Sequence, residues 1–390
     1  MHERCCGTSK NAASTRTASN EERDNPGMRI ALLTYSTKPR GGVVHTLALA
    51  EALARSGSDV TVWSLGRGGD NTFFRDVDPA VSIRIVPFAA IDGEDVGARI
   101  VRSIEVLGTA FTHDDYDIVH AQDCISANAV GPCIRTIHHL DQFTTPALAA
   151  CHERAVVQPY ARICVSEAVA REVRAGWNLE PTVIPNGVDS ARFEAAAGDD
   201  AARRRWADEL GDYVLAVGGI EPRKGSIDLV EAYALLAARR PDLRLVFAGG
   251  ETLFDYRAYR DEFDARCAQL GVRPTILGTI ADNALPSLVA QASVFAFFST
   301  KEGFGLAAME ALAAGVPVAA RDLPVLREVF RDTVLFASTH PQMAAALDQS
   351  ADPARTESGQ ALARAHSWDD TARMHLDFYL AHKRFDCTAI

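Results

Sequence analysis

The 390-residue sequence has no apolar run of 18 or more residues, the length that a helix needs to span a bilayer. It therefore predicts no transmembrane anchor, and it leaves peripheral contact with a membrane open. Lys and Arg number 40 against 51 Asp and Glu, which gives a net charge of −11, and the basic residues are scattered. Because nucleic-acid backbones are bound through clustered cations, the sequence argues against a nucleic-acid partner.

The sequence also lacks the marks of an exported or metal-stabilised protein. Its eight cysteines include no pair of CxxC motifs, so neither a zinc site nor a disulfide framework is indicated. Residues 1–27 are polar and contain no apolar core of the kind found in a secretory signal. We expect a disordered leader there, with Met28 as an alternative start, and a cytoplasmic protein.

What the sequence does contain is a regular alternation of short apolar strands and amphipathic helices. It runs from MRIALLTYS at Met28 to VIPNGVD, is interrupted by a charged, alanine-rich stretch, and restarts with YVLAVGG, LRLVFAGG and VFAFFS. Such alternation is typical of parallel sheets with helices on both faces. The sequence predicts an α/β fold of two doubly wound domains, 28–190 and 212–365, joined by a linker at 191–211. Ligands are expected where strand carboxyl ends face a cleft.

The most informative stretch is STKEGFGLAAMEALAAGVPVAA at 299–320, which follows the apolar strand VFAFFS. A strand, a glycine loop and a helix in that order point backbone N–H groups, and the positive end of the helix dipole, toward an anion such as a phosphate. Glu302 lies in the loop, and Glu310 lies roughly 7.5 Å further along the helix, a distance suited to a sugar diol. An ordinary α/β junction with a solvated Glu310 is the alternative.

A second loop, AVGGIEPRKGS at 216–226, places Arg223 and Lys224 after the strand of the same domain. A diphosphate needs such cations if no metal is present. The string is not a P-loop, because Lys224 precedes Gly225 where the P-loop requires the reverse order. A solvated lysine remains the alternative.

In the first domain, STKPRGGVVHTL places Gly41 and Gly42 between a strand and a helix. The spacing lacks GxGxxG, so a nicotinamide site is poorly supported, but glycines let a ligand approach the backbone closely. His45 in the following helix is expected to be structural. The string TIHHLDQF places His138 and His139 at the end of an apolar stretch.

The run EGFGLAAMEALAAGVPV resembles the Glu, seven residues, Glu signature of the family 4 retaining glycosyltransferases, which have the GT-B fold. The resemblance covers nearly all of 28–385 and is closest to a bacterial subgroup with GGIEPRKGS and HHLDQF variants. It implies Glu302 at the donor sugar and phosphate, Glu310 on the ribose, and the backbone near Ile280 at the base. The donor-binding residues implied are Gly41, Gly42, Gly219, Arg223, Lys224, Ile280, Glu302, Gly303, Phe304, Gly305, Leu306 and Glu310.

The resemblance also implies catalytic roles for Glu302, His138, Lys224 and Arg223. A Thr, any residue, His pattern makes His138 the cleft histidine, with His139 and His120 as alternatives. Family members carry a Gly-Arg pair where this chain has Gly218 and Gly219. Either Arg223 supplies the missing charge, or the diphosphate is held by one fewer cation.

The implied activity is metal-independent sugar transfer, with retention, from a nucleotide-diphosphate sugar to an unknown small-molecule, lipid or glycan acceptor, with no cofactor. A sugar phosphorylase on the same fold and a non-catalytic nucleotide-sugar sensor are the alternatives. The resemblance further implies that residues 366–385 form a helix that packs back on the first domain, against the alternative of a cap on the second.

Two acidic motifs invite other interpretations. Asp115 and Asp117 have the Asp-x-Asp spacing with which other glycosyltransferases hold manganese, but they precede a strand in the first domain, and we interpret them as a solvated turn. Asp282 is expected to be the N-cap of the helix that follows it.

Overall fold

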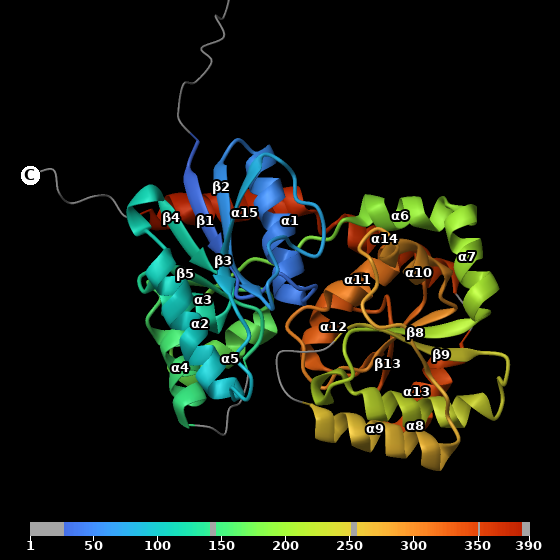
Figure 1. The fold of residues 1–390 in the computed structure, drawn as a ribbon. Helices are drawn as coiled ribbons and strands as arrows, with labels where there is room; N and C mark the ends of the chain where they lie inside the picture. The colour runs from blue at the N-terminus through green and yellow to red at the C-terminus, as the bar shows by residue number, and fades with distance from the viewer. Residues whose placement is uncertain (1–26, 141–145, 251–255, 350–351, 384–390) are drawn as a thin grey trace, which may run out of the picture.

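The computed structural model describes residues 27–140, 146–250, 256–349 and 352–383. They form two lobes, each built around one parallel sheet (Figure 1). The strand order is β3-β2-β1-β4-β5-β6-β7 in the first lobe and β10-β9-β8-β11-β12-β13 in the second. The predicted α/β fold with two doubly wound domains is therefore confirmed.

The first lobe interleaves its strands with helices on both faces of the sheet. Its strands are β1 (Arg29–Leu33), β2 (Asp59–Arg67), β3 (Val81–Phe88), β4 (Ile118–Ala121), β5 (Ile134–Ile137), β6 (Ala161–Cys164) and β7 (Thr182–Val183). Its helices are α1 (Gly41–Arg55), α2 (Val96–Ala110), the 3-10 turn η1 (His113–Asp115), α3 (Cys124–Val130), α4 (Pro146–Val157) and α5 (Glu167–Trp177).

The second lobe repeats this construction. Its strands are β8 (Tyr213–Val217), β9 (Arg244–Ala248), β10 (Thr275–Ile276), β11 (Val294–Phe297), β12 (Val318–Arg321) and β13 (Leu335–Ala337). Its helical segments are α6 (Ser190–Gly198), α7 (Asp200–Leu210), η2 (Pro222–Lys224), α8 (Ser226–Ala237), α9 (Arg257–Leu270), α10 (Leu285–Gln291), α11 (Leu306–Ala313), α12 (Pro324–Phe330), α13 (His340–Leu347) and α14 (Pro353–Arg364).

The central strands are apolar because helices cover both faces of each sheet. All four residues of β4 and of β11 are buried, and β1 is buried from Ile30 onward. This explains why these segments appear in the sequence as continuous apolar runs rather than as alternating ones.

The charged stretch 191–211, expected to be a linker, lies almost wholly in α6 and α7. Asp189 and Asp199 cap the two helices, since each side chain accepts a hydrogen bond from the backbone of the first turn. Both helices pack against α10 of the second lobe. The alanine and charge content that suggested a linker is equally typical of surface helices.

The last described helix, α15 (Trp368–His382), crosses back to the first lobe and lies beside α1 (Figure 1). Trp368, Phe378 and Tyr379 are buried in the same apolar cluster as Leu47 and Leu53 of α1. Each such side chain contributes roughly 1.5–3 kcal/mol of transfer free energy, so this helix is an integral part of the first core.

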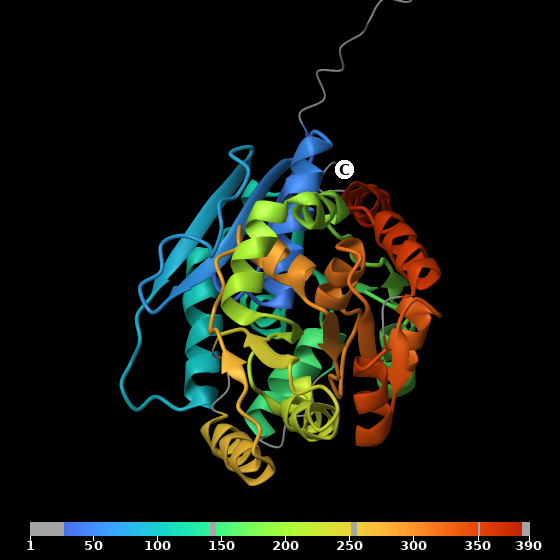
Figure 2. The same ribbon diagram turned by 90° about the vertical axis from the view of Figure 1, so that its right-hand side faces the viewer.

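The two lobes touch through the loops that follow β5 and β11. Figure 2 views the molecule from the side of the second lobe, which lies in front of the first. A Cβ built on Gly303, after β11, would lie 1.5 Å from the carbonyl oxygen of His138, after β5. Beside this contact, Glu328 of α12 accepts hydrogen bonds from the backbone N–H groups of Glu167 at 2.7 Å and Ala168 at 2.8 Å. These N–H groups begin α5, where a carboxylate is favoured by the helix dipole.

Candidate functional site

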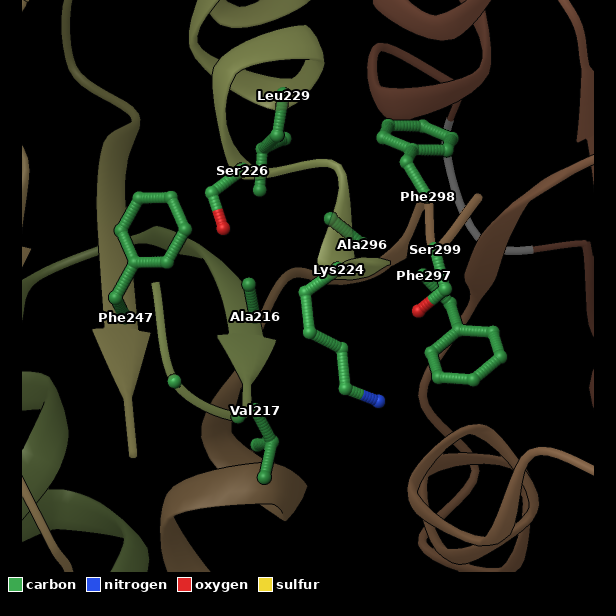
Figure 3. A pocket seen from close by; sticks show the side chains of 12 residues that line it. Ala216, Val217, Lys224, Ser226, Leu229, Phe247, Ala296, Phe297, Phe298 and Ser299 are labelled. Carbon is green, nitrogen blue, oxygen red and sulfur yellow. The ribbon is translucent and has the colours of Figure 1, made fainter. Parts of the chain in front are cut away.

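The candidate site lies at the carboxyl ends of β8 and β11, which are paired side by side and run parallel. Adjacent parallel strands bring their carboxyl-end loops together, so the two loops selected from the sequence become neighbours. A small pocket between them is lined by residues that include Gly218, Gly219, Lys224, Phe297 and Ser299. In Figure 3 the Lys224 side chain lies between Val217 of β8 and the end of β11.

The backbone of this loop depends on one glycine in particular. Gly225, between η2 and α8, has φ of 64°, and a Cβ there would lie 2.3 Å from the carbonyl oxygen of Phe298. Only glycine tolerates both the left-handed conformation and the close approach. Gly225 thus holds the Arg223 and Lys224 turn against the end of β11.

Glu302 is the centre of the charged groups in this site. One of its carboxylate oxygens accepts from Lys224 Nζ at 2.7 Å and from Arg223 Nη1 at 3.1 Å. Burial alone raises the pKa of Glu302, but Lys224 and Arg223 outweigh it and lower the pKa to about 2. Glu302 is therefore ionised at neutral pH, and its side chain is only 11% exposed.

The second guanidinium nitrogen of Arg223, Nη2, lies 3.2 Å from Glu221 Oε1, so Arg223 bridges two carboxylates. Gly219 brings no charge to this pocket, and Arg223 contacts the same Glu302 oxygen as Lys224 does. The structure thus places a second cation beside Lys224, although Gly219 stands where family members have arginine. The sequence did not single out Glu221.

Glu310 lies on α11 in different surroundings. Burial, opposed by Arg192 and reinforced by the nearby Asp282 and Asp189, raises the pKa of Glu310 to about 8. Arg192 is itself paired with Asp282 at 2.8 Å, so much of its charge is already compensated. Glu310 is thus largely protonated at neutral pH. Sequence reasoning missed Arg192 and Asp189 because they come from the start of α6.

Asp282 does not have its predicted role. The helix it was expected to cap, α10, begins only at Leu285, with Ala284 at the N-cap position and no side-chain cap. Pro286 at the start of that helix needs no hydrogen-bond acceptor for its nitrogen. The Asp282 carboxylate does not cap this helix and instead forms an ion pair with Arg192.

On the first lobe, His138 lies between the glycine loop and the second lobe. A Cβ on Gly42 would lie 3.7 Å from the His138 ring, while the His138 carbonyl faces Gly303. Burial, with Arg135 and other histidines nearby, lowers the pKa of His138 well below its ordinary value, so the ring is neutral. Around Gly41 a Cβ would meet nothing within 4 Å.

The alternative histidines differ in their surroundings. His120 is fully buried, and its two ring nitrogens each lie 2.7 Å from a hydroxyl, that of Tyr379 on α15 and that of Thr136. Its hydrogen-bonding capacity is therefore used within the core. His139 is partly buried.

The remaining predicted donor residues form the base of α11 and its surroundings. Gly305 is the N-cap of α11 with φ of 101°, and Phe304 is buried against His366. Leu306 packs against the main apolar clusters of both lobes, and Ile280 packs against that of the second. Nothing in the structure tests their roles in binding a donor, which remain predictions.

The Asp115 and Asp117 pair does not converge on a metal position. Asp117 accepts from the Arg29 backbone and side chain, and Lys383 lies 3.7 Å away. Its role is to tie the start of β4 to β1. Within the described ranges, no three His, Cys, Asp or Glu side chains are grouped as metal ligands.

Chemically, the site offers two adjacent cations, an ionised carboxylate, a carboxyl that titrates near neutrality and a neutral imidazole from the opposite lobe. Cations at a strand end stabilise phosphate oxygens. A carboxyl such as Glu310 can hydrogen-bond a diol. Sequence comparisons are consistent with this chemistry.

Two family models match the chain, "Glycosyltransferase Family 4" over residues 39–192 and "Glycosyl transferases group 1" over residues 200–351. The D-inositol 3-phosphate glycosyltransferase of Jonesia denitrificans is 29% identical over 91% of this chain and 96% of its own length. That of Mycolicibacterium gilvum is 30% identical over 80% and 78%. The phosphatidyl-myo-inositol mannosyltransferase of Mycobacterium tuberculosis is 28% identical over 78% and 80%.

Solved structures share the fold. Sucrose-phosphate synthase from Thermosynechococcus elongatus matches 91% of this chain and 99% of its own with a TM-score of 0.74 at 20% identity. HepE from Anabaena, in complex with UDP and glucose, matches the same shares with a TM-score of 0.68 at 18% identity. At these identities the likeness shows the two-lobed GT-B fold alone.

Proposed function

This chain belongs to the family 4 glycosyltransferases, and we propose that it transfers a sugar from a nucleoside diphosphate to a small acceptor, with retention of configuration and no metal ion. The observation that carries this proposal is the convergence of Lys224 and Arg223 on Glu302 at the carboxyl ends of β8 and β11. Among the described residues, no helix is both long and apolar enough to cross a membrane.

The diphosphate of the donor would bind where Lys224 and Arg223 now meet Glu302. Their charges stabilise the diphosphate as it leaves, which is the role that a metal ion plays in other transferases. Gly219 stands where family members have an arginine. Arg223 supplies a positive charge in its place, because its guanidinium reaches the same Glu302 carboxylate oxygen as Lys224 does. Glu302, displaced from these cations, then accepts hydrogen bonds from the donor sugar.

His138 would act from the opposite lobe. Its lowered pKa keeps the ring neutral, so its role is hydrogen bonding to the sugar or its phosphate rather than charge compensation. The contact of its carbonyl with Gly303 brings this histidine to the donor loop when the lobes meet. Closure of the lobes therefore assembles the site.

For the acceptor, the names of the relatives suggest where to begin. Two of them are D-inositol 3-phosphate glycosyltransferases, and another is a phosphatidyl-myo-inositol mannosyltransferase. We propose a polyol phosphate or a lipid that carries one as the first acceptors to test, with other small hydroxyl compounds as the comparison set.

The proposal is tested by thermal shift with UDP-, GDP- and ADP-sugars, followed by mass spectrometry of products formed with inositol phosphate. A ligand that binds only the folded state raises its stability by RT ln(1 + [L]/Kd). We expect one nucleotide class to raise the melting temperature, and Lys224→Ala to remove most of the rise. No shift with any nucleotide sugar would contradict the donor site.

The same assay separates the alternatives. Turnover that uses inorganic phosphate as the acceptor identifies a phosphorylase. Binding without turnover, unaffected in Glu302→Gln, identifies a sensor. Activity that EDTA abolishes and manganese restores would overturn metal independence.

A further inference from the structure

One arginine ties together the two loops that carry the charged groups of the site. Arg321 is the last residue of β12, which pairs with β11 in the sheet. Its Nε donates a hydrogen bond to the carbonyl oxygen of Phe298, the residue after β11, at 2.8 Å. Its Nη2 donates to the carboxylate of Asp228, in the first turn of α8. A single guanidinium therefore joins the end of β11 to the start of α8.

The two points that Arg321 joins lie close along the chain to the charged groups. Asp228 follows Lys224 by four residues, and Phe298 precedes Glu302 by four. Lys224 Nζ and the Glu302 carboxylate are in contact at 2.7 Å, so this contact depends on how near α8 stays to the end of β11. A shift between those two elements would move the lysine relative to the carboxylate.

Both partners in this tie are held by their surroundings. The Arg321 side chain is 17% exposed, and a Cβ on Gly225 would lie 3.1 Å from its Nη2, so the guanidinium packs against the turn before α8. Oδ1 of Asp228 lies 3.1 Å from Nε2 of His340, at the start of α13. Arginine suits this place because its rigid fork of donors serves two acceptors at once, whereas the lysine ammonium is a point charge.

We propose that Arg321 is a positioning residue of the donor site, which fixes the distance between Lys224 and Glu302. This inference rests on the proposed function, in which the diphosphate of the donor replaces Glu302 as the partner of Lys224. The lysine must then keep its place while its partner changes. The pocket between the two loops is lined without Arg321, so Arg321 acts through the loops rather than on the donor itself.

The first test needs no ligand. The backbone N–H of Thr300 donates to the carbonyl oxygen of Arg223 at 2.7 Å, a hydrogen bond that joins the two loops directly. Arg321→Lys keeps the charge but not the fork, so we expect amide exchange at Thr300 to become about 10-fold faster through local opening, while Leu215 within β8 keeps its rate. Asp228→Asn should have the same effect and serves if Arg321→Lys fails to fold.

Arg266→Lys is the matched control. Arg266 of α9 pairs with Glu231, which lies one turn further along α8 than Asp228, so this variant weakens a tie to the same helix without reaching β11. It should leave the exchange at Thr300 unchanged. Unchanged exchange in both Arg321→Lys and Asp228→Asn, or an equal increase in Arg266→Lys, would overturn the proposal.

Binding measurements then separate this inference from the proposed function. In calorimetric titrations with UDP, GDP and ADP, Arg321→Lys should raise the Kd of the nucleotide that binds by about 10-fold, a size found for residues that share one network. Added to Lys224→Ala, it should raise Kd by no more than about 2-fold, because both changes act on one contact.

The outcomes of these titrations are distinct. If none of the three nucleotides binds the wild type, or if Lys224→Ala leaves Kd unchanged, the donor site itself fails, and this inference fails with it. If Lys224→Ala weakens binding and Arg321→Lys does not, only the positioning role fails. Effects that multiply in the double variant would show that Arg321 does not act through Lys224, and would also overturn the positioning role.

Discussion

The raised pKa of Glu310 predicts that the affinity for the donor increases as the pH rises from acid toward about 8. Burial and the neighbouring Asp282 and Asp189 raise this pKa to about 8. A carboxylate that accepts hydrogen bonds from both ribose hydroxyls must be ionised, so binding at neutral pH requires Glu310 to release a proton. Affinity should therefore rise with pH up to about 8 and then level off.

The size of the effect follows from the same pKa. If only the ionised form binds, the observed Kd is multiplied by 1 + 10^(pKa − pH), which is about 10-fold at pH 7 and about 100-fold at pH 6 for a pKa of about 8. From about pH 8.5 down to about pH 6, Kd should therefore increase by roughly 75-fold. Glu310→Gln should remove this slope and bind with an affinity that does not vary over the range.

Isothermal titration calorimetry of the nucleotide sugar chosen by thermal shift measures both the affinity and the protons released. In buffers of different ionisation enthalpy, close to one proton should be released at pH 7. A 2′,3′-dideoxy analogue of the nucleotide, which lacks the diol, should bind without the slope, and Glu328→Gln, a carboxylate at the lobe contact, should keep it. A flat Kd in the wild type, or the same slope in Glu310→Gln, would refute the reasoning.

Three further predictions concern the contact between the lobes and the core beneath it. Gly303→Ala would place a Cβ 1.5 Å from the His138 carbonyl oxygen and so push the lobes apart. We expect kcat to fall at least ~100-fold, and small-angle scattering to report a larger radius of gyration at a nearly unchanged melting temperature. Full activity would contradict this contact. Glu328→Gln replaces a carboxylate that accepts hydrogen bonds from two backbone N–H groups at the start of α5. Amide hydrogen exchange at Glu167 and Ala168 should become about 10-fold faster, as expected for a loss of about 1–2 kcal/mol. Unchanged exchange would rule out these hydrogen bonds. Burial lowers the pKa of His375 to about 4, so over this range the unfolded state binds a proton that the folded state does not. The free energy of unfolding should therefore fall as the pH drops from about 6.5 to about 4. His375→Leu should lessen this loss of stability in denaturant titrations, and an undiminished pH dependence would show that His375 is not its source.

The sequence could locate the loops of the candidate site, because each of them follows the end of an apolar strand. The order of strand, loop and helix located Glu302 and the Arg223 and Lys224 pair, because parallel strands expose their carboxyl-end loops at one edge of the sheet. That these two loops are adjacent depends on the pairing of β8 with β11, which lie far apart in sequence. The sequence alone could not show that pairing.

The surroundings of Glu310 could not be predicted, because they are made by a different part of the chain. Asp189 caps α6 and Arg192 lies in its first turn, at the junction between the predicted first domain, 28–190, and the predicted linker, 191–211. Asp282 was misassigned because an acidic residue shortly before an apolar run is typical of an N-cap, whereas here the helix begins three residues later. These errors arise where tertiary packing, rather than local pattern, decides a side chain's partner.

His45 illustrates a different limit. The sequence places it in an amphipathic helix, where a buried histidine is usually structural, and the structure confirms its burial. Its unpartnered Nε2, its bond to Asn186 and its ring contact with His138 join three segments of the chain. No local pattern contains that information.

The central claim is that Lys224, Arg223 and Glu302 form the donor site of a sugar transferase. The most direct measurement is release of the nucleoside diphosphate from UDP-, GDP- and ADP-sugars in the presence of inositol phosphate and EDTA, for the wild type and Glu302→Gln. We predict release by the wild type with one nucleotide class, and a loss of at least ~100-fold in the variant, of the order that removal of one transition-state contact costs. Equal turnover in Glu302→Gln, or no release from any nucleotide sugar, would contradict the account.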